Sequence, residues 1–450
     1  MKKEIRPLLL LLAGLLLWGT LFAQEDNKKL DDDSTEYQAP AGKLSLLRLR
    51  KSYALGRGIS LRSPAGSFNI SQSIQTLYGV STPNKNFSGL SSQFAVNRAR
   101  LSLFSSLMDK KIELNLRLDF GSNNQSAATG ARSFNNVLQE AYVAYTPTRA
   151  HSFNFGLRAD YTDTRELRVE GENLGFIGRS ALSGAFDAIF DFGLRYKGNY
   201  KIGKRSLLKP YLSITTGDSR AALQKNYGGL KYGIRLDYLP FDKFTSGGEF
   251  YMDDLAREPK PRLVIGSVLS YNDGISSAVG TNGGRWLYGD AHQKILLPDY
   301  TKWIVDYLFK YRGFYSMGSY VMTSSKIPAG IAGEFKLTGA FTSYSGQTEA
   351  QIKSTVMSRL NIGRGYNVQA GYVLPSDWSF SFRYAWLKDD AGSADFASQN
   401  RHYTFVVTRY LSGNNLKVQL ESGYDELKQS LQSGNQTGNY YSQLQFTLQL

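Results

Sequence analysis

The side chains that most often carry catalysis or bind metals are sparse in this chain of 450 residues. It has no cysteine and three widely separated histidines, His151, His292 and His402. The lack of cysteine excludes disulfides, thiolate metal sites and cysteine nucleophiles, and three scattered imidazoles argue against a histidine metal cluster. His292 with Asp290 is the candidate catalytic pair, because the expected strands bring no serine or acid close to the other two histidines. We therefore expect no metal, no cofactor and no enzymatic activity.

Basic side chains recur instead along segments in which polar and apolar residues alternate. Lysine and arginine number 53 against 38 aspartates and glutamates, which gives a formal net charge of +15. The bases expected on the polar side of the alternation are Arg98, Arg100, Arg117, Arg158, Arg195, Lys197, Lys201, Lys231 and Arg235. Acids interleave with them, so one interpretation is a balanced ladder of ion pairs. The other is a surplus positive potential that draws anions along this face.

The elements that must position these bases are β-strands. From Lys111 to Phe120, leucine and isoleucine occupy alternate positions, while Glu113, Arg117 and Asp119 fall between them. The same alternation recurs over residues 192–202, 230–238, 378–386, 416–421 and 444–450. A period of two is typical of strands with one apolar and one polar face.

The lengths of these strands and of their links favour a membrane barrel over a soluble β-sandwich. Segments of about ten residues exceed the usual strand of a soluble sheet and suffice to cross a bilayer when tilted. Short links are expected at 109–110, 146–150, 203–205, 240–243, 375–376 and 412–414. Long links are expected at 81–92, 121–135, 160–190, 218–228, 389–400 and 425–438. Such alternation is typical of outer-membrane barrels, whose periplasmic turns are short and whose extracellular loops are long.

The predicted fold class is therefore all-β, a closed antiparallel transmembrane β-barrel over residues 66–450. A spanning sheet must close on itself because lipid cannot hydrogen-bond to the backbone. We expect about 16–18 strands around a wet lumen, into which the polar faces point. The pattern is least regular over 272–300, which is ambiguous, and over 353–374, which could form one long strand bent at Gly363–Gly365.

The first 23 residues predict a secretory signal peptide. Lys2, Lys3 and Arg6 precede a leucine-rich stretch of about ten residues, and Ala23 supplies a small residue at the exit. That stretch is short for a membrane anchor, which needs roughly 20 residues. We expect cleavage after Ala23, and export disfavours nucleic acid as the partner of this basic chain. Residues 24–65, acidic at first, are expected to form a partly disordered periplasmic tail.

Several segments resemble the phosphate-selective porins O and P. The segment Phe94–Leu101, with its two arginines, resembles the arginine-rich second strand of that family. Leu157-Arg158, Thr164–Leu167 and Ile177–Ser180 resemble its third-loop region, and Gly371–Pro375, Phe382–Tyr384 and Tyr403–Leu420 resemble its later hairpins. The resemblance covers roughly residues 56–450, with two departures. Asn97 stands where the pattern usually has another arginine, and the chain ends in Leu450 where outer-membrane proteins often end in phenylalanine.

This resemblance implies a 16-stranded outer-membrane diffusion channel for phosphate or other small anions, commonly a homotrimer, with one loop folded inward as a constriction. Candidate constriction residues in the 160–190 loop are Arg165, Arg168 and Arg179. The closing strand is expected to present Leu444, Phe446, Leu448 and Leu450 to lipid and to the barrel-assembly machinery.

Two other functions fit parts of the sequence. A plugged or docking barrel of a surface complex would use segments 272–300 and 324–350 as partner loops. An outer-membrane hydrolase would need a serine or acid beside a histidine at the barrel rim.

Overall fold

The computed structural model describes residues 50–83, 88–121, 137–218, 226–280, 285–336, 339–392, 399–427 and 438–450. The predicted signal peptide and residues 24–49 of the predicted tail lie outside these ranges, as do most of the expected links 121–135 and 425–438. The division of the chain into leader, tail and barrel therefore stays a prediction. No helix in the described ranges combines the length and the apolar character that a membrane crossing requires.

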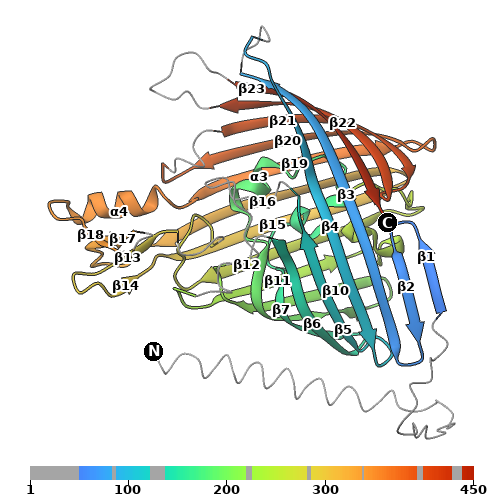
Figure 1. Ribbon diagram of the computed structural model, residues 1–450, viewed down its shortest axis with the longest axis horizontal. Helices are drawn as coiled ribbons and strands as arrows, with labels where there is room; N and C mark the ends of the chain where they lie inside the picture. Colours follow the sequence, from blue (N-terminus) through green and yellow to red (C-terminus); the bar gives the residue numbers. More distant parts are fainter. Residues whose placement is uncertain are drawn as a thin grey trace, which may run out of the picture. The chain divides into compact units, whose positions relative to one another are not determined.

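Sixteen antiparallel wall strands close into a barrel (Figure 1). They are β3 (Gly66–Thr82), β4 (Ser91–Leu107), β5 (Ile112–Asp119), β6 (Leu138–Thr148), β7 (His151–Ala159), β8 (Phe190–Gly198) continued by β9 (Tyr200–Ile202), β10 (Ser206–Thr215), β11 (Lys231–Leu239), β12 (Arg262–Asn272), β15 (Asp299–Tyr311), β16 (Phe314–Lys326), β19 (Gly363–Val373), β20 (Trp378–Asp389), β21 (Gln399–Ser412), β22 (Leu416–Leu427) and β23 (Gly438–Gln449). Leu444 pairs with Tyr78 where β23 meets β3. The predicted closed barrel is confirmed, with the lower of the expected strand counts.

Side-chain exposure alternates along the wall as the sequence predicts. On β5, Leu114 and Leu116 are exposed, while Asn115 and Asp119 between and after them are buried. A closed barrel with an apolar outer face can satisfy its backbone within lipid. The fold is therefore that of an outer-membrane protein.

Two further strands extend the wall at the short-turn end. The hairpin of β1 (Arg50–Ala54) and β2 (Gly58–Ser63) pairs with the first part of β3, whereas β23 pairs with the remainder. Gly56, at the tip of the hairpin, donates its N–H to the carbonyl of Gln449 at 3.1 Å. The hairpin thus lies directly below the C-terminus and fills a step in the wall (Figure 1).

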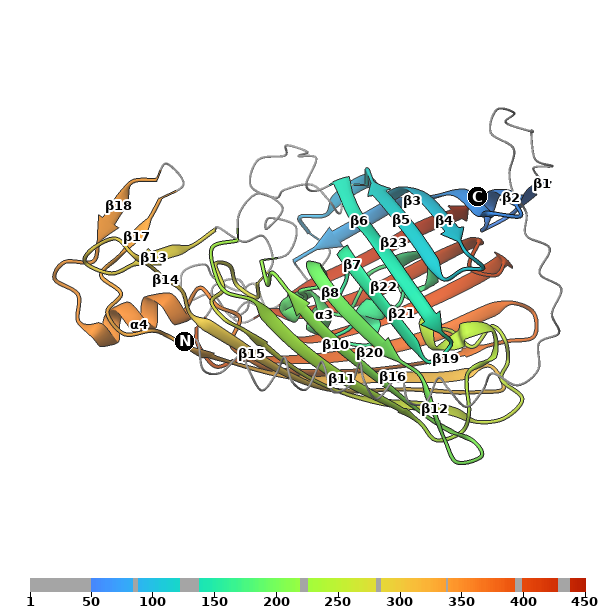
Figure 2. The ribbon, with the colours of Figure 1, turned by 90° about the horizontal axis from the view of Figure 1, so that it is seen from below.

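The expected long link at 160–190 does not project outward, so that part of the predicted topology is wrong. Residues 160–189, which we call the inward loop, enter the lumen and carry the short helix α3 (Ala181–Phe186). In Figure 2, α3 lies within the ring of strands. The resemblance to the phosphate-selective porins, in contrast, implied that one loop folds into the lumen.

Two other expectations need correction. The link between β11 and β12 is not a short turn at 240–243 but runs over residues 240–261, which we call the lower insert. It contains the 3₁₀ segment η5 (Thr245–Phe250), and Met252 is fully buried in the lumen. Residues 353–374 are not one bent strand, because helix α4 (Glu349–Met357) precedes β19.

Part of the ambiguous segment 272–300 and part of the 324–350 segment form a small outer sheet at the long-loop end. It consists of β13 (Leu287–Gly289), β14 (Ile295–Leu296), β17 (Gly333–Phe335) and β18 (Phe341–Ser343). Tyr288 and Leu296 pack with Val356 of α4 in a core of their own. Both ribbon views place this unit beyond one end of β15 and β16 (Figures 1 and 2).

Candidate channel through the barrel

Buried ion pairs fix the base of the inward loop to the wall. The carboxylate of Asp160 accepts a hydrogen bond from Lys231 Nζ at 2.7 Å. Asp163 accepts one from Lys302 Nζ at 3.0 Å. All four side chains are at least nine-tenths buried. Because each buried charge has a partner within hydrogen-bond distance, the loop base has one electrostatically favoured position.

Arg165 is a third buried anchor of the inward loop. Its guanidinium donates to Asp237 at 2.7 Å and to Asp306 at 3.0 Å. Arg235 donates to the same two carboxylates, and Arg168 donates to Asp237 at 2.6 Å. Arg165 therefore anchors the inward loop to the wall.

Apolar packing holds one side of the loop against the wall. The inward faces of several wall strands break the polar pattern here and meet buried loop side chains. The cluster includes Val169, Leu174, Phe176, Val264, Leu308 and Met317. A second cluster joins α3 to the wall through Leu182, Phe186, Val268, Ile304 and Val321. The lumen on this side is closed by a hydrophobic core.

The opposite side of the loop faces β4 and β5 across charged contacts. Arg100 donates to Glu172 of the loop at 2.7 Å and to Asp119 of the wall at 2.9 Å. Arg117 donates to both carboxylate oxygens of Glu170, at 2.8 and 2.9 Å. Of the two acids that alternate with the apolar residues of β5, Asp119 pairs with Arg100, whereas Glu113 lies opposite Ser106 and makes no ion pair within the described residues.

The charge of Glu172 depends on these arginines. Burial alone would raise the pKa of its carboxyl, but Arg100 and Arg98 outweigh burial and lower the pKa to about 2. Glu172 is consequently anionic throughout the physiological range.

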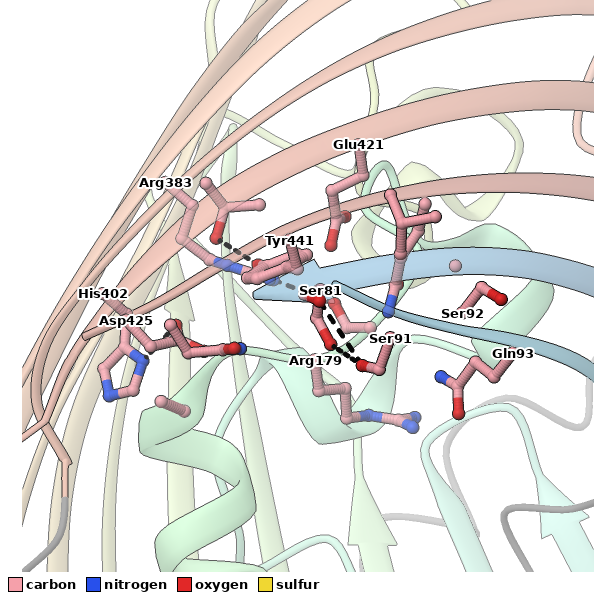
Figure 3. Close-up of a pocket in the computed structure, with 17 residues that line it drawn as sticks. Ser81, Ser91, Ser92, Gln93, Arg179, Arg383, His402, Glu421, Asp425 and Tyr441 are labelled. Carbon is pink, nitrogen blue, oxygen red and sulfur yellow. Dashed lines mark hydrogen bonds and ion pairs between the residues drawn. The ribbon is translucent and has the colours of Figure 1, made fainter. Parts of the chain in front are cut away.

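Three cavities follow one another between the inward loop and the wall. The upper cavity, of about 610 Å³, opens toward the long-loop end and is drawn in Figure 3. The central cavity, of about 570 Å³, lies against β4 to β8, and the lower cavity, of about 200 Å³, borders the C-terminus. Arg179 lines both the upper and the central cavity, while Arg100, Arg117 and Glu170 line both the central and the lower cavity.

Four bases of the central cavity make no ion pair with a carboxylate of the described residues. Arg98 donates to Gln75 Oε1 at 2.5 Å, and Arg179 donates to the carbonyl of Val169 at 2.8 Å. Arg158 stacks over the rings of Tyr142 and Tyr161, at 4.2 and 5.2 Å from their centroids. Lys197 lies 5.8 Å from the ring centroid of Phe250.

The structure therefore divides the predicted basic residues into three groups. Those that line the central cavity are Arg98, Arg100, Arg117, Arg158, Arg168, Arg179 and Lys197. Those buried between the inward loop and the wall are Arg165, Arg195, Lys231 and Arg235. Lys201 belongs to neither group, because it is exposed on β9 at the short-turn end and lines none of the three cavities.

His402 has an acid partner, so the expectation that no acid lies close to it is wrong. Its Nδ1 lies 2.7 Å from Asp425 Oδ1, across the β21–β22 ladder. In Figure 3 the imidazole turns toward Asp425, on the side of the upper cavity away from Ser91 and Ser92. Its Nε2 is buried and has no hydrogen-bond partner in the described part of the chain.

The other two histidines lie elsewhere. His151 contacts Tyr196 OH at 2.9 Å near the short-turn end, and His292 is exposed in the outer sheet. Within the described ranges, no group of three or more acidic, histidine or cysteine side chains is placed to hold a metal ion.

The lower insert and the inward side of β20 to β22 were not predicted as parts of the site. The N–H of Met252 donates to the carbonyl of Asn173 at 3.2 Å, so the insert contacts the inward loop in the lumen. Arg383 of β20 stacks over Phe176 at 4.2 Å and lies 3.4 Å from Glu166. The sequence did contain a signal for the insert. Asp253, Asp254 and Glu258 form an acidic cluster just after the expected short link, which is unlike the basic turns elsewhere in this chain.

Comparison with solved structures finds outer-membrane porins and channels among the similar chains. An anion-selective porin from Comamonas acidovorans superposes with a TM-score of 0.52 at 10% identity, over 86% of this chain and 100% of the porin. OmpF of Salmonella typhi, in complex with daunomycin, gives 0.49 at 11% identity, over 89% and 100% of the two chains. The DcaP channel of Acinetobacter baumannii gives 0.46 at 11%, over 86% and 98%. No protein-family model and no curated protein matches the chain. The chain thus has the fold of a 16-stranded outer-membrane porin.

Proposed function

We propose that this protein is a passive diffusion channel that prefers small anions, with phosphate among its solutes. The observation that carries the proposal is the composition of the central cavity, which seven bases and five acids line. Three of these bases are neutralised by ion pairs, whereas Arg98, Arg158, Arg179 and Lys197 make none within the described residues. A surplus of positive charge in a narrow, low-dielectric passage raises the local concentration of anions.

Residues that line two neighbouring cavities indicate the route of a solute through the barrel. A solute from the long-loop end would meet Arg179 between the upper and central cavities, and then Arg100 and Arg117 before the lower cavity. The solved porin with the highest of the TM-scores given above is described as anion-selective, and that description supports the same preference here.

The test is the reversal potential of the purified protein in a planar bilayer with a potassium chloride gradient. We expect an anion-selective potential that the double variant Arg158→Gln/Lys197→Gln moves toward cation selectivity, more strongly at low salt because screening weakens the field. The matched control, Lys336→Gln/Lys353→Gln, removes two exposed bases of the outer sheet and α4 and should leave the potential unchanged.

Phosphate is tested in the same bilayer. If phosphate is a solute, added phosphate should reduce the chloride current of the wild type more than sulfate does at equal ionic strength. The reduction by phosphate should be smaller in Arg158→Gln/Lys197→Gln than in the wild type. A wild-type reversal potential that is unselective or cation-selective would contradict the anion preference, and an identical potential in the wild type and the double variant would contradict the role given to Arg158 and Lys197.

We propose a channel rather than an outer-membrane hydrolase. Hydrolysis by a serine nucleophile would require a histidine nitrogen directed at the serine hydroxyl, so that it can act as general base. The free ring nitrogen of His402 is instead buried, away from Ser91 and Ser92. An assay for ester and phospholipid hydrolysis in detergent should find the same rate for wild type and His402→Ala.

We further propose that the barrels associate as homotrimers. An outward hollow of about 460 Å³ over β4 to β8 is lined by Leu116, Val143 and Phe155 together with the small residues Ala141 and Gly156. A neighbouring barrel would cover this apolar hollow better than mobile lipid chains, since small residues permit close approach. Light scattering in detergent should give three times the protomer mass, and Ala141→Leu, which fills the hollow, should reduce it.

A further inference from the structure

The turns at the short-turn end carry an unusual concentration of positive charge. Lys110 and Lys111 lie in the β4–β5 turn, Arg149 in the β6–β7 turn, and Lys204 and Arg205 in the β9–β10 turn. All five are exposed and make no ion pair with a carboxylate of the described residues.

The same excess continues around the barrel. Lys243 and Lys260 in the lower insert, and Arg312 in the β15–β16 turn, are exposed. Asp109 and Asp242 are the exposed acids of these segments, whereas the other acids of the lower insert, such as Asp253 and Glu258, are buried. Because successive turns are about two strand spacings apart, roughly 10 Å, these bases form one continuous arc, which we call the basic rim.

The long-loop end does not show this excess. There, acids and bases of the described residues are close to balance, and several form pairs, such as Arg359 with Glu334 and Lys388 with Asp390. Most bases inside the barrel are also neutralised by acids, as described above. Among the described residues, the basic rim therefore has eight exposed bases against two exposed acids.

A belt of outward tyrosines lies immediately above the basic rim on the lipid-facing wall. Tyr145 and Tyr196 flank Phe153 in one cross-strand row, and Tyr200 and Tyr238 flank Leu208 in the next. The hydroxyls of Tyr196 and Tyr200 are 2.5 Å apart. Outward tyrosines mark the depth at which lipid headgroups meet water.

We propose that the basic rim binds anionic phospholipid headgroups of the periplasmic leaflet. The short-turn end of an outer-membrane barrel faces the periplasm, where exposed lysines and arginines just beyond the tyrosine belt meet headgroup phosphates. Each such base adds to the attraction of an anionic surface, and the attraction decays within a Debye length. The occupant is a lipid rather than a free anion, because the bases lie around the outside of the barrel beneath its apolar wall.

Spin-labelled lipids test this inference independently of conduction. Wild-type protein in phosphatidylcholine vesicles should restrict spin-labelled phosphatidylglycerol several-fold more than spin-labelled phosphatidylcholine, and the selectivity should fall with added salt. Lys204→Gln/Arg205→Gln/Lys243→Gln should bring the ratio close to one. The control Lys326→Gln/Lys336→Gln/Lys353→Gln, at the long-loop end, should keep the wild-type ratio.

Folding is checked by the heat-dependent shift in electrophoretic mobility of the barrel, and Lys110→Gln/Lys111→Gln provides a second rim variant on a different turn. A wild-type ratio in both rim variants would overturn the proposal. So would displacement of the labelled lipid by inorganic phosphate beyond that caused by chloride at the same ionic strength, since the rim would then be a free-anion site. A rim variant with altered reversal potential but unaltered lipid selectivity would equally contradict it.

Discussion

Asp187 shows how one side chain of the inward loop can set the charge of the channel. Burial raises the pKa of its carboxyl to about 6, and the neighbouring Asp163 adds to the rise. Asp187 lines the central cavity together with Arg179, which opposes the shift. The cavity therefore holds an acid whose pKa of about 6 lies close to physiological pH.

We expect anion selectivity to increase as the pH falls from 7.5 to 5. Above pH 6 Asp187 is anionic and offsets one base, and below pH 6 it is neutral, so the positive surplus grows. Asp187→Asn should show the acidic selectivity at both pH values. The measurement is the reversal potential as a function of pH, and a titration near 6 that persists in Asp187→Asn would assign the effect to another group.

At the scale of elements, the alternation of polar and apolar residues predicted the strands. The positions where this alternation fails on the lumen side mark where the inward loop packs against the wall. The outward positions of β5 and β11 could be assigned from the sequence because lipid demands apolar side chains there. The inward positions could not, since Val264, Val268 and Leu308 are apolar where a wet lumen would have polar residues. An apolar residue on the lumen side is explained only by the loop that covers it.

The basic residues of the site could likewise be predicted only in part from the sequence. The alternation of inward and outward positions along the strands was sufficient to predict which bases lie on the cavity side: Arg98, Arg100, Arg117, Arg158 and Lys197. Arg195, Lys231 and Arg235 have the same parity, yet the inward loop buries them. Which bases face water depends on the path of residues 160–189, and that path is set by tertiary ion pairs that no local pattern encodes.

The closing strand supports a prediction about assembly. Leu444 and Phe446 are exposed on the outer face, and Leu450 exchanges two backbone hydrogen bonds with Gln72 of β3, at 2.7 and 3.0 Å. Leu450→Asp should reduce the amount of folded protein in the outer membrane. Because Leu450 lies near the interface, where a lipid-facing charge costs only about 0–1 kcal/mol, the loss should come from poorer recognition by the assembly machinery.

Membrane fractionation and the heat-dependent mobility shift measure this effect, with Leu450→Phe as the matched control that should assemble at least as well as wild type. Normal surface levels of Leu450→Asp would refute the role assigned to the last residue.

For the whole molecule, the position of the loops predicts what a protease can reach. Added to intact cells, a protease should cleave in the outer sheet around residues 327–348 and spare the turns at 109–110, 203–205 and 412–414. The inward loop should also be spared, although the sequence alone grouped it with the exposed links, because most of its residues are buried. Mapping of the cut sites by mass spectrometry checks the orientation, and cleavage confined to the short turns would reverse it.

The hairpin below the C-terminus has a kinetic consequence. β1 to β4 form a meander in which each strand pairs with its neighbour in sequence, so these contacts can form early at little entropic cost. The contact between β3 and β23, in contrast, joins Tyr78 to Leu444 and closes nearly the whole chain. Since β2 already occupies the first part of β3, the incoming β23 has only the remaining part available, and Gln449 meets the hairpin tip at the end of its course. The hairpin therefore acts as a stop that sets the register in which the barrel finally closes.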